Sequence, residues 1–156
     1  MLGGDDADSW RYRWPHQHLG RLGCQSVKLL LDTHIWLWST LQPQKLSPRV
    51  TRALTNQENE LWLSPISVWE LNLLHGKGRV KAPDDVPLWV VRSVEELRLT
   101  EAPLTIEVAL AVSALHLPHG DPADHFLAAT AKVFDLTLVT ADRNLIHAPG
   151  ISVMAN

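Results

Sequence analysis

Two kinds of segment alternate along the chain: short continuous apolar runs, and longer segments whose apolar positions recur with helical spacing. Residues 29–31 and 136–139 are apolar runs of the kind that a parallel sheet buries. The pattern predicts strands at 29–31, 60–63, 98–100, 136–139 and 151–154, and helices at 35–41, 48–54, 65–75, 86–97, 104–115, 122–134 and 142–146. Strands that alternate with helices indicate an α/β sandwich with a mainly parallel central sheet.

Several predicted helices carry a start signal. Ser47-Pro48, Ser64-Pro65 and Asp121-Pro122 each place an N-cap residue before a proline at the first helical position. The segment 104–115 is rich in alanine and apolar, and we expect it to be a packed helix.

Composition favours one globular domain. The chain has 156 residues, of which 46% are hydrophobic and 20% charged, enough for a core without disulfides. A single cysteine, Cys24, excludes an intramolecular disulfide and fits a cytoplasmic protein. The apolar runs are too short to span a membrane, and a net charge of −3 predicts no broad basic surface.

The first 26 residues differ from the rest of the chain. They have neither a periodic apolar pattern nor the apolar core of a signal peptide. We therefore expect an unstructured extension at 1–26 and a folded domain at 27–156. Val27 is also where a GTG codon would start translation if the start were assigned too far upstream.

Two acids follow predicted strands. Asp32 comes directly after the run 29–31, and Asp142 follows the run 136–139 after Thr140 and Ala141. Ligands of parallel sheets bind at the carboxyl ends of the strands, so these acids are candidates for one shared site. The alternative is that each is an N-cap of the helix that follows it.

Two further acids lie on predicted helices. Glu70 shares a helix face with Ser67, in a helix that is apolar around most of its circumference, which implies burial on more than one side. Its alternative is an ion pair with a basic residue, or exposure to solvent. Asp124 lies in the first turn of the helix predicted at 122–134, and its side chain points either to solvent or to the site of Asp32. Asp121 is interpreted first as the N-cap of this helix and only second as a ligand.

A cluster of four acids requires cations, because like charges held together raise one another's pKa values. Ligation by oxygen atoms alone suits Mg²⁺ or Mn²⁺, which are typical of phosphoryl-transfer sites. The eight histidines, with no cysteine partner and no HxxxH spacing on a helix, argue against a zinc site.

Four motifs in order resemble those of the PIN-domain ribonucleases, and specifically the VapC-type toxins of bacterial toxin–antitoxin pairs. The motifs are LLLDTHIWLW, SPISVWEL, HGDPADHFLAATA and LVTADRNL, and the resemblance covers about residues 27–156. It implies a three-layer α/β/α sandwich, Mg²⁺-dependent endoribonuclease activity, a cognate VapB-type antitoxin and a homodimer.

The resemblance also implies roles for single residues. Four acids match the catalytic and metal-ligating positions: Asp32, Glu70, Asp124 and Asp142. Asp121 matches a recurring acid of the same motif. The small polar positions that support these acids are matched by Thr33, Ser67 and Thr140, and His125 stands where Arg is more usual.

Basic and aromatic residues offer further candidates. Lys77, Arg79, Lys81 and Arg143 are candidates to hold the RNA backbone, although a basic run after a helix is more often a solvated loop. We expect four tryptophans in apolar segments to belong to the core or a dimer interface: Trp36, Trp38, Trp62 and Trp69. We expect His34 to pack against neighbouring residues and not to contact the substrate.

Two other functions fit parts of the pattern. A non-catalytic PIN-like module would bind RNA or a protein without cleaving it. A phosphatase with an aspartyl nucleophile also begins with an apolar run and an acid. That chemistry usually has a second acid two residues later, where this chain has His34.

Overall fold

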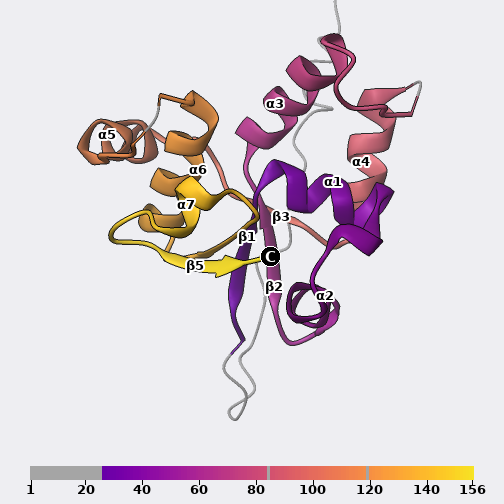
Figure 1. Ribbon diagram of the computed structural model, residues 1–156, viewed down its shortest axis with the longest axis horizontal. Helices are drawn as coiled ribbons and strands as arrows, with labels where there is room; N and C mark the ends of the chain where they lie inside the picture. Colours follow the sequence, from indigo (N-terminus) through magenta and orange to yellow (C-terminus); the bar gives the residue numbers. More distant parts are fainter. Residues whose placement is uncertain (1–25, 84, 119) are drawn as a thin grey trace, which may run out of the picture.

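The computed structural model describes residues 26–83, 85–118 and 120–156. The extension predicted at 1–26, with Cys24, lies outside these ranges apart from Ser26. The described residues form a five-stranded sheet with helices on both sides (Figure 1).

The central sheet is parallel throughout, as the sequence predicts. Its strand order is β3-β2-β1-β4-β5, and every neighbouring pair is parallel. The strands are β1 (Lys28–Leu31), β2 (Glu60–Leu63), β3 (Thr100–Glu101), β4 (Thr137–Thr140) and β5 (Ser152–Ala155). The last strand is an edge strand.

The helices occupy the predicted segments with small shifts at their ends. They are α1 (Thr33–Leu41), α2 (Pro48–Thr55), α3 (Pro65–Gly76), α4 (Val86–Glu96), α5 (Ile106–Ala114), α6 (Pro122–Val133) and α7 (Arg143–Ile146), with a short 3₁₀ helix, η1, at Pro43–Lys45. Ser47 and Ser64 act as the predicted N-caps by accepting hydrogen bonds from Val50 N and Ile66 N.

One strand begins later than predicted. Arg98 has a φ of 52°, and its N–H donates to Glu95 O while Leu99 N donates to Val94 O. These bonds close the end of α4 with a left-handed residue, so the chain becomes extended only beyond Arg98. β3 is therefore Thr100–Glu101 rather than 98–100.

Alternate residues of the central strand supply two separate cores. Leu29 and Leu31 face a core that includes residues of α1 to α4, whereas Leu30 faces a core built mainly from α6, α7 and the adjoining strands. All three leucines are fully buried. The two layers of helices lie on opposite sides of the sheet (Figure 1), which confirms the predicted three-layer α/β/α sandwich.

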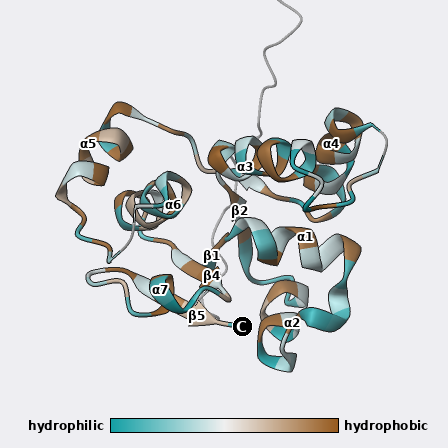
Figure 2. Ribbon diagram, turned by 45° about the horizontal axis from the view of Figure 1, so that its top comes forward, coloured by the Kyte–Doolittle hydropathy of each residue, from teal (hydrophilic) through white to brown (hydrophobic). Residues whose placement is uncertain are grey.

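Helix α5 is packed on one side only. Its residue Val108 is fully buried, but Ile106 is 82% exposed and Leu110 is 68% exposed. Figure 2 shows apolar segments on this outer helix. The prediction of a packed helix was therefore wrong for this face of α5.

The predicted burial of α3 and of the tryptophans is only partly correct. Trp36 is fully buried, and Trp38 and Trp62 are half-buried. On α3, however, Trp69 is 47% exposed and Leu73 is 40% exposed. The apolar circumference of α3 thus overstated its burial in the single chain.

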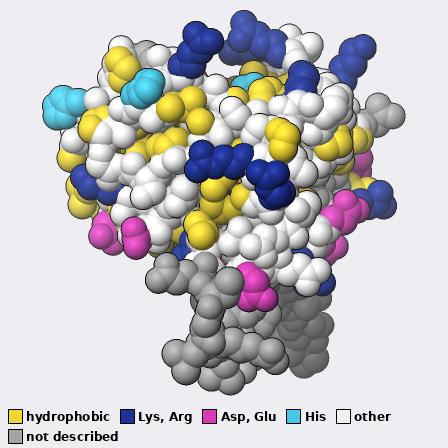
Figure 3. All heavy atoms as spheres, turned by 60° about the horizontal axis from the view of Figure 1, so that its bottom comes forward, with side chains coloured by type: hydrophobic (Ala, Val, Ile, Leu, Met, Phe, Trp, Pro, Cys, Tyr) yellow, Lys and Arg dark blue, Asp and Glu magenta, His cyan; other side chains and the backbone are white. Residues whose placement is uncertain are grey.

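The surface carries charge of both signs. Figure 3 shows one face, on which Lys and Arg side chains lie between apolar and uncharged ones, with Asp and Glu nearer its margins. In the part of the chain that the structure describes, no helix has the length and apolar character needed to cross a membrane.

Candidate active site

The four predicted acids, far apart in the sequence, line a single cavity. Its volume is about 270 Å³. The lining residues are Asp32, His34, Trp38, Glu70, Asp121, Asp124, Ala141 and Asp142. The structure therefore brings together every acid that the sequence singled out, including Asp121.

Two of these acids meet because β1 and β4 are neighbouring parallel strands. Leu31 pairs with Val139, and Asp32 N donates to Val139 O at 3.0 Å, one residue beyond the end of β1. Asp142 follows β4 after Ala141. The carboxyl ends of adjacent parallel strands lie at the same edge of the sheet, so both acids reach the cavity.

The other acids come from the two helical layers. Glu70 lies on α3, which packs with α1, and Asp124 lies in the first turn of α6, on the opposite side of the sheet. Asp121 is the N-cap of α6. Since α3 also contacts α6, the cavity lies where both layers meet the carboxyl edge of the sheet.

Asp32 is held by a neighbouring strand and not by a capping bond. It occupies the N-cap position of α1, but its side chain makes no capping hydrogen bond. Instead the Thr140 hydroxyl donates to Asp32 Oδ2 at 2.6 Å and accepts from Asp142 N at 3.0 Å. The capping interpretation of Asp32 is therefore wrong.

Asp121 and Asp142 each cap a helix and also line the cavity. Asp121 Oδ1 accepts from Ala123 N at 3.0 Å, and Asp142 Oδ1 accepts from Asn144 N at 2.8 Å, so the capping prediction is confirmed for both. Capping occupies one carboxylate oxygen, and a carboxylate has lone pairs on two. Both residues can therefore cap a helix and line the cavity.

Burial raises the pKa of Asp32, which is only 5% exposed. The hydrogen bond from Thr140, the charge of His34 and the Thr33 backbone all act to lower this pKa, and the charge of Asp142 acts to raise it. The carboxylate is thus held in a site that disfavours its own charge.

Burial likewise raises the pKa of the half-buried Glu70. The neighbouring Thr33 hydroxyl and His34 oppose this rise, whereas the charges of Asp32 and Asp121 add to it. Among the described residues, none of the groups that shift this pKa is a Lys or Arg. The predicted alternative of an ion pair for Glu70 is therefore not found in this part of the chain.

The donor set of the cavity fits a hard divalent cation in its chemistry. Its acids offer only oxygen atoms, the ligands that Mg²⁺ and Mn²⁺ prefer. Among the described residues, the buried hydroxyls of Thr33 and Ser67 have no hydrogen-bond partner of regular geometry. Within 26–83, 85–118 and 120–156, however, no three acids or histidines already converge closely enough to enclose an ion.

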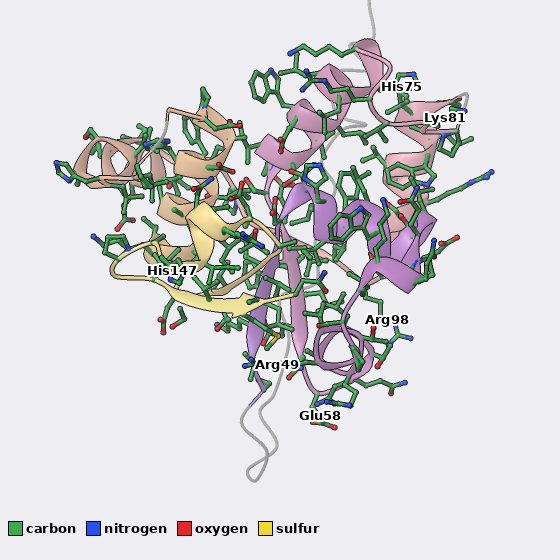
Figure 4. All side chains as sticks on the ribbon, viewed as in Figure 1. Arg49, Glu58, His75, Lys81, Arg98 and His147 are labelled. Carbon is green, nitrogen blue, oxygen red and sulfur yellow. The ribbon has the colours of Figure 1, made fainter. Side chains whose placement is uncertain are left out.

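The candidate RNA-binding cations lie outside the lining of the cavity. Arg143 is exposed and directly follows Asp142. Lys77, Arg79 and Lys81 are exposed beyond the end of α3, and Lys77 lies roughly 10 Å from Glu70 along the helix axis, at 1.5 Å per residue. Figure 4 places Lys81 and His75 near the α3–α4 loop, away from the strands. Near the cavity, the ring Nδ1 of His125 lies 2.8 Å from Asp121 O.

The sequence did not predict two of the lining residues as part of the site. His34 and Trp38 were expected to pack; Trp38 does pack against the hydrophobic core, but both residues also line the cavity. The available signal was their spacing: residues four apart share a face of α1, and this face begins beside Asp32.

Comparison with known proteins identifies the family. The family model described as the PIN domain matches residues 29–151. The chain belongs to the PIN-domain family. Ribonuclease VapC22 of Mycobacterium tuberculosis is 34% identical to it over 120 residues, which are 75% of this chain and 88% of that protein.

Solved structures share the PIN fold. A chain in the crystal structure of VapBC2 from Rickettsia felis, bound to a DNA fragment from their promoter, has a TM-score of 0.62 at 18% identity, covering 83% of this chain and 98% of that one. A chain in the crystal structure of FitAcB from Neisseria gonorrhoeae has a TM-score of 0.56 at 27% identity, covering 82% and 96%.

The raised pKa of Asp32 predicts that this acid destabilises the metal-free protein. The folded state binds the proton more tightly than the unfolded chain, so stability falls as pH rises from the ordinary value of 3.8 through the raised pKa. In EDTA at pH 7, Asp32→Asn should therefore raise the Tm, by about 2–4 °C for each kcal/mol regained.

Thermal unfolding of both proteins between pH 3.5 and 8 measures this effect. The difference in Tm should shrink toward the acid end, where Asp32 is protonated in either state. Glu58→Gln is the control, because Glu58 is exposed and outside the cavity. A Tm for Asp32→Asn below that of the wild type, at pH 7 without metal, would contradict the raised pKa of Asp32.

Proposed function

We propose that this PIN-domain protein is a Mg²⁺-dependent endoribonuclease, the toxin of a toxin–antitoxin pair, with Mn²⁺ able to substitute for Mg²⁺. The observation that carries the proposal is the convergence of four acids from separate segments on one cavity. The proposal is also supported by the 34% identity between this chain and a protein named as a ribonuclease.

In this proposal Asp32, Glu70, Asp124 and Asp142 hold the metal, and Asp121 is a further candidate ligand. The chemistry supplied by a bound divalent ion is Lewis acidity, which stabilises charge on phosphoryl oxygens and activates water for in-line hydrolysis. No side chain needs to act as a nucleophile.

The remaining polar residues position these acids. Thr140 fixes Asp32 by donating to Oδ2, and it fixes the start of the α7 turn by accepting from Asp142 N. The buried hydroxyls of Thr33 and Ser67 are proposed to support neighbouring acids: Thr33 directly follows Asp32, and Ser67 lies three residues before Glu70 on α3. Arg143, Lys77, Arg79 and Lys81 are proposed to hold the RNA backbone.

The proposed partners are a VapB-type antitoxin and a second copy of the chain, in the cytoplasm, where the RNA substrate is. Two similar solved structures are of VapBC2 and FitAcB. The apolar face of α5, with Ile106 and Leu110, supports a homodimer because such residues are usually buried. An apolar cavity of about 330 Å³, which includes Val68, Val90 and Val94, is available for a partner segment.

The first test is metal-dependent RNA cleavage. The purified chain should cleave RNA in Mg²⁺ or Mn²⁺, and EDTA should stop it. Asp32→Asn, Glu70→Gln and Asp124→Asn should each reduce the cleavage rate by on the order of 100-fold or more, because each removes part of a charge stabilisation of several kcal/mol.

Glu58→Gln should cleave at the wild-type rate. Full activity of Asp32→Asn or Asp124→Asn would contradict the proposed site. A wild-type protein that binds RNA but neither cleaves it nor binds Mn²⁺ would favour the alternative, a non-catalytic PIN-like binding module.

The second test concerns Thr140. Thr140→Val keeps the shape of the side chain but removes the hydroxyl that donates to Asp32. It should lower kcat by about 10- to 100-fold, the usual effect of losing a group that orients a metal ligand. Thr140→Ser should restore most of the activity. Thr137→Val, on the same strand but distant from the cavity, is the control, and an equal loss in that variant would contradict the role of Thr140.

The third test is the oligomeric state. Light scattering should give the mass of a dimer for the wild-type chain, and the double variant Ile106→Asp and Leu110→Asp should give a monomer. Leu88→Asp, at an apolar position on α4 that is 44% exposed, should remain a dimer. Dimers of the α5 variant would exclude this face as the interface.

A further inference from the structure

Trp38 has an unusual setting for an indole, since five of the eight residues lining its cavity are acids. It is half-buried on α1, one turn after His34, and the two ring centroids are 5.9 Å apart at an interplanar angle of 59°. Trp36 on the same helix differs completely: it is fully buried and donates from Nε1 to Ser93 Oγ at 3.2 Å. Helix α1 thus buries one indole completely, whereas the other packs partly against the core and also lines the acidic cavity.

A cation lies over the same indole. Lys45 Nζ is 5.4 Å from the Trp38 ring centroid. The backbone of Lys45 is anchored by the last residue of the chain: Asn156 Nδ2 donates to Lys45 O at 3.0 Å, while Ser47 N donates to Asn156 Oδ1 at 2.7 Å. The exposed ammonium is therefore carried by a fixed segment.

These two groups suit the part of an RNA that the acids cannot hold. Carboxylates repel phosphates, so a substrate in this cavity needs a neutral contact and a nearby positive charge. Aromatic faces bind the bases of single-stranded RNA by stacking, with little dependence on sequence. A lysine beside the stacked base can contact a phosphate and position the strand.

We propose that Trp38 stacks on a nucleobase that flanks the scissile phosphate, and that Lys45 binds a neighbouring phosphate of the same RNA strand. This inference rests on the proposed ribonuclease function and adds a substrate subsite to it. In this subsite Trp38 and Lys45 are binding residues, and they act without contact with the metal.

The chain contains a matched control pair. Lys28 Nζ lies 5.9 Å from the ring centroid of Trp62, which is also half-buried and stacks on Phe134. Lys28 begins β1, at the end of the strand opposite to Asp32. Substitutions in this pair cause the same loss of an indole or of one charge, but away from the cavity.

The experiment measures stacking and kinetics separately. Single-stranded RNA carrying 2-aminopurine at each position in turn is titrated with the full chain in the Asp32→Asn background, in which we expect cleavage to be too slow to disturb the titration. Fluorescence should be quenched at one or two positions. Trp38→Leu should abolish this quenching, Trp38→Phe should retain it, and Trp62→Leu should leave it unchanged.

In the otherwise wild-type protein, Trp38→Leu should raise KM about tenfold and change kcat by less than about threefold, a loss of binding rather than of chemistry. Lys45→Gln should lower the slope of log affinity against log salt by about one, and Lys28→Gln should not. Persistent quenching with Trp38→Leu, or an equal KM effect of Trp62→Leu, would overturn the inference while the ribonuclease function stands. A wild-type chain that neither binds nor cleaves RNA would overturn both.

Discussion

The hydrogen bond from the Thr140 hydroxyl to Asp32 Oδ2, 2.6 Å long, joins the carboxyl ends of the two central strands. Both side chains are buried, so the bond forms away from competing water. The same hydroxyl accepts from Asp142 N and thereby sets the start of α7. Helix α1 begins immediately after Asp32 and carries His34 and Trp38 into the same cavity. The remaining acids of the cavity, Glu70, Asp121 and Asp124, are brought to this junction by the packing of α3 and α6.

The buried carboxylates of the site lower the stability of the metal-free fold. Asp32 and Glu70 both have raised pKa values because burial and neighbouring acids disfavour their charge. The fully buried strand residues 29–31, which pack on both layers of helices, supply stabilisation that does not depend on the cavity. An active site commonly lowers stability where its chemistry needs like charges close together. The proposed cation would remove this conflict, since it neutralises the carboxylates when it binds.

Much of the fold could be predicted because its signals are local. The apolar run 29–31 and the Ser-Pro or Asp-Pro helix starts depend only on neighbouring residues, but the order of the strands does not. The capping interpretation of Asp32 failed because its partner Thr140 is 108 residues away. The direction of Asp124 and the exposure of Trp38 likewise depend on which elements pack nearby. The exposed face of α5, including Ile106, has the composition of a core helix, so periodicity alone could not separate the two.

The proposed function requires that Asp32 and Asp142, which follow β1 and β4, share a divalent cation with Glu70 of α3 and Asp124 of α6. The most direct measurement is a crystal structure of the wild-type chain soaked in Mn²⁺, with data collected at the manganese absorption edge. We expect an anomalous peak inside the cavity, from an ion directly coordinated by carboxylate oxygens of Asp32 and at least one of Glu70, Asp124 and Asp142. Anomalous peaks only at the protein surface, with an empty cavity at saturating Mn²⁺, would contradict the shared cation site.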